Sequence, residues 1–179
     1  MSNVLIGIIG VILFIGLALA GALFLGERFA QSRNTSVASA TVQAVSQISN
    51  GINLYNAENG LPLVATTNPT FLTTPGSAYL KSVPINPTGG PAAQILTETA
   101  TGVATLPGRL VVMKLAGADA DVCKAIARQT TSGLDTVGAN GFVEANSAAE
   151  MPAGPAGCFM VKTAFGALDA NGYYAFSRP

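Results

Sequence analysis

Val4 to Leu25 read VLIGIIGVILFIGLALAGALFL, and these 22 residues contain no charged or strongly polar side chain. Because an α-helix rises about 1.5 Å per residue, a helix of this length can cross the ~30 Å hydrocarbon core of a bilayer. We therefore expect a helix of transmembrane length. A cleaved secretory signal peptide is the alternative, but no basic stretch precedes the run, and the run exceeds the usual ~7–15 apolar residues of such signals.

Small residues interrupt the apolar run. A glycine costs about 1 kcal/mol of helix propensity relative to alanine, so the glycines are the predicted weak points of the helix: Gly7, Gly10, Gly16, Gly21 and Gly26. Small residues also recur four positions apart, as at Gly16 and Ala20, a spacing that lets helix backbones approach closely. The run is either a single anchor with membrane-typical composition or a helix that assembles with other helices. We favour assembly because the helical pattern continues beyond the run into an amphipathic stretch.

No proline breaks the helical pattern between Glu27 and Tyr55. Apolar residues recur there on one face of a 3.6-residue period, namely Val37, Thr41, Ala44, Val45, Ile48, Ile52 and Tyr55, while polar residues occupy the opposite face, namely Gln31, Ser39, Gln43, Gln47, Asn50 and Asn53. We predict one helix of about 50 residues, roughly 80 Å long, with a stop at Asn59-Gly60 before Pro62. Two helices with a joint near Gly26 are the alternative.

The pattern divides the chain into two parts. Residues 1–26 form the apolar half of the helix, suited to a membrane, and residues 27–179 form a globular head that includes the amphipathic half 27–56. The head is large enough to bury its own core.

The composition disfavours several classes of function. Only 10% of the 179 residues are charged, nine Lys and Arg balance nine Asp and Glu, and there is no His. Direct nucleic-acid binding is not expected because it needs clustered basic residues. Without His, and with two Cys, hydrolytic triads and zinc sites are not expected either. We predict no enzyme, no catalytic residue, no cofactor and no metal site.

Cys123 and Cys158 are an isolated pair, 35 residues apart. They favour a structural disulfide in an oxidising compartment; a free buried pair and a redox pair remain alternatives, although no CxxC spacing is present.

Arg28 and Arg33 follow the apolar run, so the positive-inside rule alone would leave the head in the cytoplasm. The cysteine pair and the arginines indicate opposite sides of the membrane for the head. They agree if a short basic leader preceded Met1 and was removed after insertion, and we expect such a leader.

The rest of the head predicts an α+β fold. Residues 61–108 are rich in proline and small polar residues and are expected to form surface loops with one short helix or strand. Leu110–Met113 predicts a buried strand, and Asp119 is the predicted N-cap of a helix over residues 120–130. Asp119 and Asp121 could be imagined as metal ligands. The helix dipole alone favours negative charge at the first turn of a helix, so we do not expect a metal there.

The end of the chain predicts two further strands, Cys158–Val161 and Tyr173–Phe176. Between them, Asp169-Ala-Asn171-Gly172 predicts a hairpin turn in which Asn-Gly supplies a positive φ. The start of a calcium loop is the alternative, but the required glycine and glutamate are missing. We expect a small antiparallel sheet packed on the long helix.

These features together resemble type IV pilins and their relatives, the type II secretion pseudopilins. The resemblance lies in the apolar and then amphipathic helix, in Tyr55-Asn-Ala-Glu-Asn-Gly60-Leu-Pro62, and in the loop Tyr79-Leu-Lys-Ser-Val-Pro-Ile-Asn-Pro-Thr-Gly-Gly-Pro91. The late cysteine pair is similar to the disulfide-bounded C-terminal region of type IVb pilins. Two departures stand out: Leu5 replaces the glutamate usual in the family, and Ala22 stands where many members have proline.

The resemblance implies a structural subunit that is stored in the inner membrane as a single-pass protein with its head outside, and is then polymerised into an extracellular filament. It implies other copies of this chain, the inner membrane, and an assembly machinery of platform, motor ATPase and prepilin peptidase as partners. Met1 is the implied processed and methylated N-terminus. The implied filament-core packing residues are Val4, Leu5, Ile8, Ile9, Val11, Ile12, Phe14, Ile15, Leu17, Leu19, Leu23 and Phe24.

Two other functions remain as alternatives. One is a minor pilin or pseudopilin that primes or caps a filament, which Leu5 favours. The other is a single-span, membrane-anchored binding module that recognises a ligand through its loops.

Overall fold

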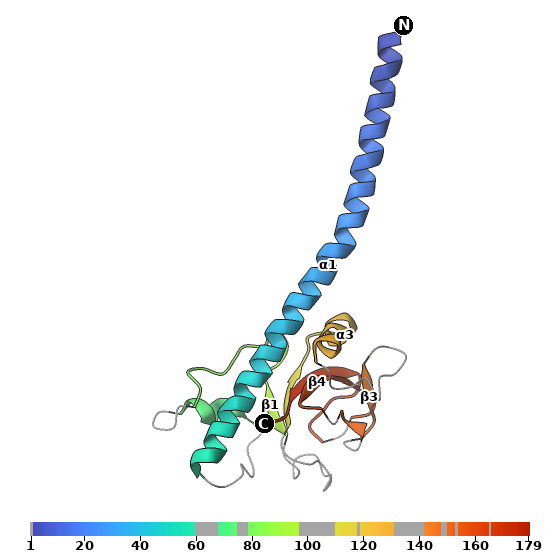
Figure 1. Cartoon of the computed structure of the whole chain (residues 1–179). Coiled ribbons are helices and arrows are strands. Elements are labelled where there is room, and N and C mark those ends of the chain that lie inside the picture. Colours follow the sequence, from blue (N-terminus) through green and yellow to red (C-terminus); the bar gives the residue numbers. More distant parts are fainter. Residues whose placement is uncertain are drawn as a thin grey trace. The chain divides into compact units, whose positions relative to one another are not determined.

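The computed structural model describes residues 2–59, 68–74, 79–96, 110–117, 119–130, 142–147, 150–152, 154–164 and 166–179. The chain forms two units, Met1–Asn34 and Thr35–Pro179. The elements in chain order are α1 (Ser2–Asn59), the 3-10 helix η1 (Pro69–Thr73), β1 (Gln94–Leu96), β2 (Leu110–Lys114), α3 (Ala120–Gln129), β3 (Val143–Ala145), β4 (Ala156–Val161) and β5 (Gly172–Ser177) (Figure 1).

Helix α1 is a single element of 58 residues, so the prediction of one helix is confirmed and the alternative joint near Gly26 is wrong. The helix ends at Asn59, as the sequence predicted. There the Asn59 side-chain amide donates a 2.9 Å hydrogen bond to the carbonyl of Tyr55. This bond ties the side chain of the last helical residue to the preceding turn.

The predicted amphipathic pattern is confirmed from Thr35 onwards. Val45, Ile48 and Ile52 are fully buried, and Gln43, Gln47, Asn50 and Asn53 are exposed. Thr41 is also buried, and its hydroxyl donates to the Val37 carbonyl at 2.8 Å. A buried hydroxyl is tolerated because this bond replaces its bond to water.

The sheet has five strands in the order β1-β2-β5-β4-β3. Strands β1, β2, β5 and β4 pair antiparallel, as predicted, with Met113 and Cys158 both opposite Ala175 of β5. The prediction of a purely antiparallel sheet is wrong, because β3 pairs parallel with β4. Since β5 occupies one edge of β4, β3 adds to the other edge, where it runs in the same direction as β4.

Both faces of the sheet are covered within the second unit. On one face, Ile48 and Ile52 of α1 pack with Ile95, Val111 and Met113, and the apolar side of α3 packs nearby around Ala38, Leu115, Val122, Ile126 and Ala175. On the other face, a separate cluster contains Leu110, Val112, Phe159, Val161, Leu168 and Phe176. Burial on both faces explains why β2 reads as a continuous apolar run.

The connections differ from the sequence predictions in two details. Asp119 does precede α3, but its side chain makes no capping hydrogen bond; its φ of −77° and ψ of 63° lie outside the extended region that capping requires. The turn before β5 is part of a longer connection, residues 162–171, rather than a tight hairpin. The predicted positive φ is confirmed at Asn171, at 58°, and the Asn171 amide closes the connection by donating to the Val161 carbonyl at 2.6 Å.

The proline-rich region contains both a short helix, η1, and a short strand, β1. Asn86, which is buried, holds its loop against the end of β2. Its amide nitrogen donates to the carbonyls of Pro91 and Lys114, at 2.8 and 2.7 Å, and its oxygen accepts bonds from Thr88. The Thr88 hydroxyl in turn accepts from the Ala116 amide at 2.9 Å. This network gives the loop a fixed shape without regular secondary structure.

Candidate membrane and assembly segment

The apolar segment Val4–Ala22 is the most unusual surface of the first unit. Its 19 residues have a mean hydropathy of 2.8, and none of the segment is buried within the chain. In the part of the chain that the structure describes, it is the one helical stretch long and apolar enough to cross a membrane. Length and composition therefore permit membrane anchoring.

The predicted packing residues of this segment are all exposed where the structure describes them. Ten of the twelve side chains have exposed fractions between 49% and 74%: Val4, Leu5, Ile8, Ile9, Val11, Ile12, Phe14, Ile15, Leu17 and Leu19. The side chains of Leu23 and Phe24, and Met1 as a whole, lie outside the described residues. Burying one such side chain is worth about 1.5–3 kcal/mol, so this surface gains stability from a lipid or protein environment.

The glycines of the segment have no packing role within the chain. Beyond the adjacent residues and the nearby backbone of the helix itself, a Cβ added at any of Gly7, Gly10, Gly16, Gly21 or Gly26 would meet no atom within 4 Å. Gly51, in the second unit, differs, because a Cβ there would lie 3.1 Å from Leu80 Cγ and 3.4 Å from Leu72 Cδ1. The small residues of the apolar segment thus leave open surface for another molecule to approach.

The chain matches no family model, no curated protein and no solved structure.

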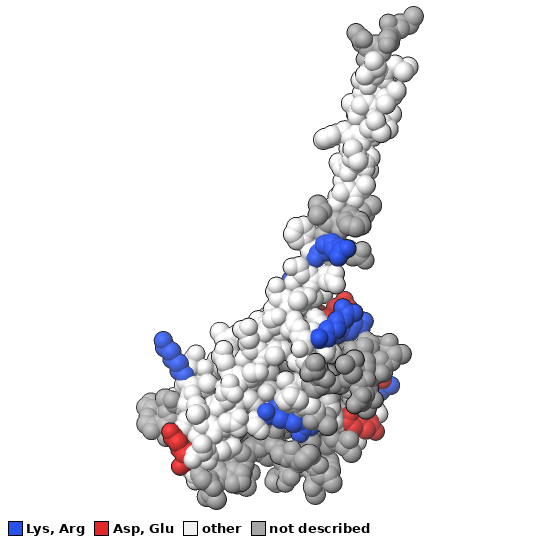
Figure 2. Space-filling model, viewed as in Figure 1, with Lys and Arg blue, Asp and Glu red and all other residues white. Residues whose placement is uncertain are grey.

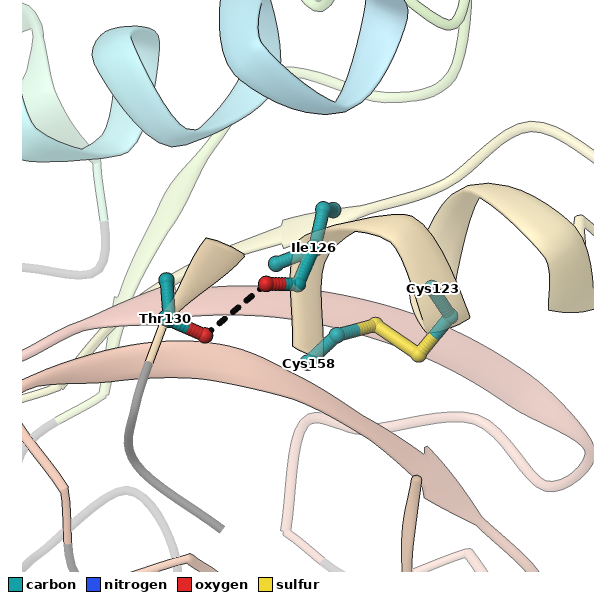
Figure 3. Close-up of a disulfide and its surroundings, with 4 residues drawn as sticks. All are labelled: Cys123, Ile126, Thr130 and Cys158. Carbon is teal, nitrogen blue, oxygen red and sulfur yellow. Dashed lines mark hydrogen bonds between the residues drawn. A yellow bond between two sulfur atoms is a disulfide. The ribbon is translucent and has the colours of Figure 1, made fainter. Parts of the chain in front are cut away.

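The second unit is tied by the predicted disulfide, which is present between Cys123 of α3 and Cys158 of β4 (Figure 3). The two Cα atoms are 5.4 Å apart, and both residues are buried. Ile126 lies one turn after Cys123 on the buried side of α3, and the Thr130 hydroxyl donates to its carbonyl at 2.9 Å (Figure 3). The disulfide ties α3 to β4 of the sheet, and the Thr130 bond closes the C-terminal end of α3. The free-pair alternative is therefore wrong.

An uncharged polar face runs along α1 in the second unit. Between Thr35 and Ala57 the sequence contains no charged residue, and Figure 2 shows a broad uncharged area over this part of the helix. Gln43, Gln47, Asn50 and Asn53 are exposed on it. Ser39 is only half-exposed because its hydroxyl contacts Gln129 of α3 at 3.2 Å, a contact that helical periodicity could not predict.

The clearest polar cluster of the head surrounds a small hollow. Lys114 Nζ lies 2.7 Å from a carboxylate oxygen of Asp169, and the Tyr174 hydroxyl accepts a 2.8 Å bond from the Asp169 amide. The hydrogen bond from Lys114 lowers the pKa of the Asp169 carboxyl and raises the pKa of Lys114, whereas burial raises the pKa of Tyr174. Gln94 and Pro91 also line the hollow, whose volume is about 50 Å³.

This hollow suits water rather than an organic substrate, since ligand pockets are typically ~300–1,000 Å³. Asp169 is engaged by a cation, so its geometry supports the turn interpretation rather than a calcium loop. Asp121 likewise lies near a cation, 3.7 Å from Lys124 Nζ. Among the described residues, no group of three or more potential His, Cys, Asp or Glu ligands comes together.

Proposed function

We propose that this chain is a structural subunit of a type IV pilus-like filament, stored in a membrane through its apolar segment and polymerised through the same segment. The observation that carries the proposal is the fully exposed apolar segment Val4–Ala22 attached to a folded, disulfide-linked head. A lipid bilayer and a bundle of identical helices both cover such a surface. Transfer between them does not expose the segment to water.

The glycines and the uncharged face of α1 support this proposal. Open space around Gly7, Gly10 and Gly16 permits close approach of neighbouring helices. The absence of charge between Thr35 and Ala57 allows copies to pack side by side without self-repulsion. Head-to-tail contacts whose rotation does not close produce an open helical polymer.

Two isoleucine-to-lysine variants test the proposal. Ile12 is in the apolar segment and Ile85 is on a loop of the head, and both side chains are exposed, at 64% and 90%. In cells that assemble this chain, we expect Ile12→Lys to abolish surface filaments because the helix bundle would bury an unpaired charge. We expect Ile85→Lys to assemble normally.

Membrane fractionation separates assembly from anchoring. A central lysine costs about 2.5–3.5 kcal/mol in membrane insertion, which the remaining apolar residues offset, so Ile12→Lys should stay in the membrane fraction. Normal filaments from Ile12→Lys would contradict the proposal and favour an anchored binding module.

A minor pilin or pseudopilin is the second candidate, and Leu5 favours it. Residues 1–26 contain no acidic group, so a carboxylate in this segment cannot pair with a neighbour's N-terminal amine. Quantitative mass spectrometry of purified surface filaments distinguishes the two roles. A main subunit forms most of the filament mass, whereas a priming or capping subunit is present in a few copies.

A further inference from the structure

Two arginines and a phenylalanine come after the apolar segment within the first unit. Arg28, Phe29 and Arg33 are all exposed on α1, Phe29 to 70%. Their positive charges conflict with the expected topology of the chain. Their distance from the apolar segment indicates a different role.

The spacing places these residues at the edge of a bilayer. If the uncharged run Val4–Leu25 fills the hydrocarbon core, Arg28 lies about 4–5 Å beyond the core and Arg33 about 12 Å beyond it along the helix axis. The polar headgroup layer adds roughly 5–8 Å on each side of the core. Helical side chains tilt toward the helix N-terminus, and arginine stems are long, so both guanidinium groups can reach back into that layer.

The three residues also share one side of the helix. At 100° per residue, the positions of Arg28, Phe29 and Arg33 fall within a sector of about 140°. The Glu27 position lies roughly opposite the middle of this sector by the same periodicity. The sector is therefore basic and aromatic, and it borders the apolar segment.

We propose that Arg28 and Arg33 bind the phosphates of anionic phospholipid headgroups, with Phe29 at the boundary of the acyl chains. Guanidinium groups bind phosphate oxygens in a bidentate manner that ammonium groups do not reproduce. Phenylalanine is among the apolar residues that amphipathic helices place at the boundary between headgroups and acyl chains. The inference rests on the membrane-stored stage of the proposed function, and it is independent of polymerisation.

The test uses the full-length, disulfide-intact chain in vesicles of phosphatidylcholine containing phosphatidylglycerol. Electron paramagnetic resonance of spin-labelled lipids measures the association of each lipid class with the protein. A basic residue near the surface contributes about fivefold in attraction to anionic lipid, so we expect a preference for phosphatidylglycerol of that order or larger. The preference should disappear in R28Q/R33Q and weaken in R28K/R33K.

The matched control is K81Q/K124Q, which removes two positive charges from the head and should leave the preference unchanged. Circular dichroism checks that R28Q/R33Q keeps its helix. Equal association of the two lipids with the wild type, or an unchanged preference in R28Q/R33Q, would overturn the inference.

The failures of the two proposals are distinguishable. If the chain inserts into vesicles without a lipid preference, the headgroup site is wrong and the filament proposal stands. If the chain does not enter vesicles at all, the membrane-stored stage of the proposed function is itself wrong.

Discussion

Helix α1 contains two stretches with the same secondary structure and opposite relations to the rest of the chain. In Val4–Ala22, Ile12 is 64% exposed, whereas in the later stretch Ile48 is fully buried. The glycines of the first stretch have open space around them, and Gly51 of the second lies against two leucines. Helical periodicity alone therefore does not define a core. The chain's own sheet buries the apolar side chains of the later stretch. Those of Val4–Ala22 can be buried only by lipid or by another protein molecule.

The largest expected difference between the two stretches is in their isoleucines. Ile48→Ala should lower the free energy of unfolding of the head by about 2–5 kcal/mol, because it leaves a cavity against Val111 and Met113. Ile12→Ala should leave the thermal unfolding of the head unchanged. Calorimetry of both variants in the same detergent measures the difference. Equal melting temperatures would show that the later stretch is not part of the head's core.

Removing the disulfide should affect the head nearly as strongly. In the chain-entropy model, a loop of this size contributes roughly 3–4 kcal/mol, so Cys123→Ser/Cys158→Ser should melt at a lower temperature. Membrane association should be unchanged because it depends on Val4–Ala22. Flotation and calorimetry on one preparation measure both quantities. A double variant that leaves the membrane fraction while its head stays folded would contradict this separation.

A glycine substitution gives a smaller effect of the same kind. In Gly90→Ala, the new Cβ would collide with the backbone carbonyl of Lys114 and lie 2.8 Å from Asn86 Nδ2. We expect a loss of about 1–3 kcal/mol in the head. Gly16→Ala, with open space around it, is the control and should not change the head's melting temperature. An unchanged melting temperature of Gly90→Ala would show that the hydrogen bonds of Asn86 can rearrange around the new Cβ without loss of stability.

The smallest expected effect is electrostatic. The pKa of Asp169 is lowered by the hydrogen bond from Lys114, so the pair stabilises the head above the unfolded pKa of about 3.9 and the contribution is lost as the pH falls through the folded pKa. Lys114, whose pKa is raised, keeps its contribution until the pH rises above about 10.4. Both groups are at least partly exposed, so the effect is modest.

Asp169→Asn tests this pair. Its melting temperature should lie slightly below that of the wild type at pH 7, and the difference should shrink as the pH falls through the lowered pKa of Asp169. Comparing the variant with the wild type cancels the protonation of other carboxylates, including Glu150, whose pKa is lowered by the Asn146 amide. The stretch Val4–Ala22 contains no titratable side chain, so its membrane association should not change over this range. A difference that widened toward pH 3 would contradict the assignment.

The long helix, its end at Asn59 and three of the strands could be predicted because each has a local signal. Ile48 and Ile52 recur at the helical period, and the apolar run of β2 is buried on both faces. The strand β3, three residues long, could not be predicted, since its pairing with β4 depends on which sheet edge is free. Asp119 was placed correctly but does not cap α3, because its side-chain contacts depend on the backbone angles of the preceding loop.

The candidate site could be predicted in part. The apolar run and the cysteine pair are visible in the sequence, and the structure adds that Ile12 and its neighbours have no internal cover. It also adds the contact between Ser39 and Gln129, which lie 90 residues apart. The Asn86 network escaped prediction for the same reason, since Asn86 is 28 residues from Lys114. Tertiary contacts between distant polar residues produce no repeating pattern in the sequence.

The strand order has a consequence for biogenesis. Strand β5, the last regular element, lies at the centre of the sheet between β2 and β4, and Ser177 donates to Ser49 of α1. The chain therefore cannot complete its sheet until its final residues have been synthesised. A chain that ended before β5 would lack the strand that joins β2 to β4, and both strands would keep an unpaired edge.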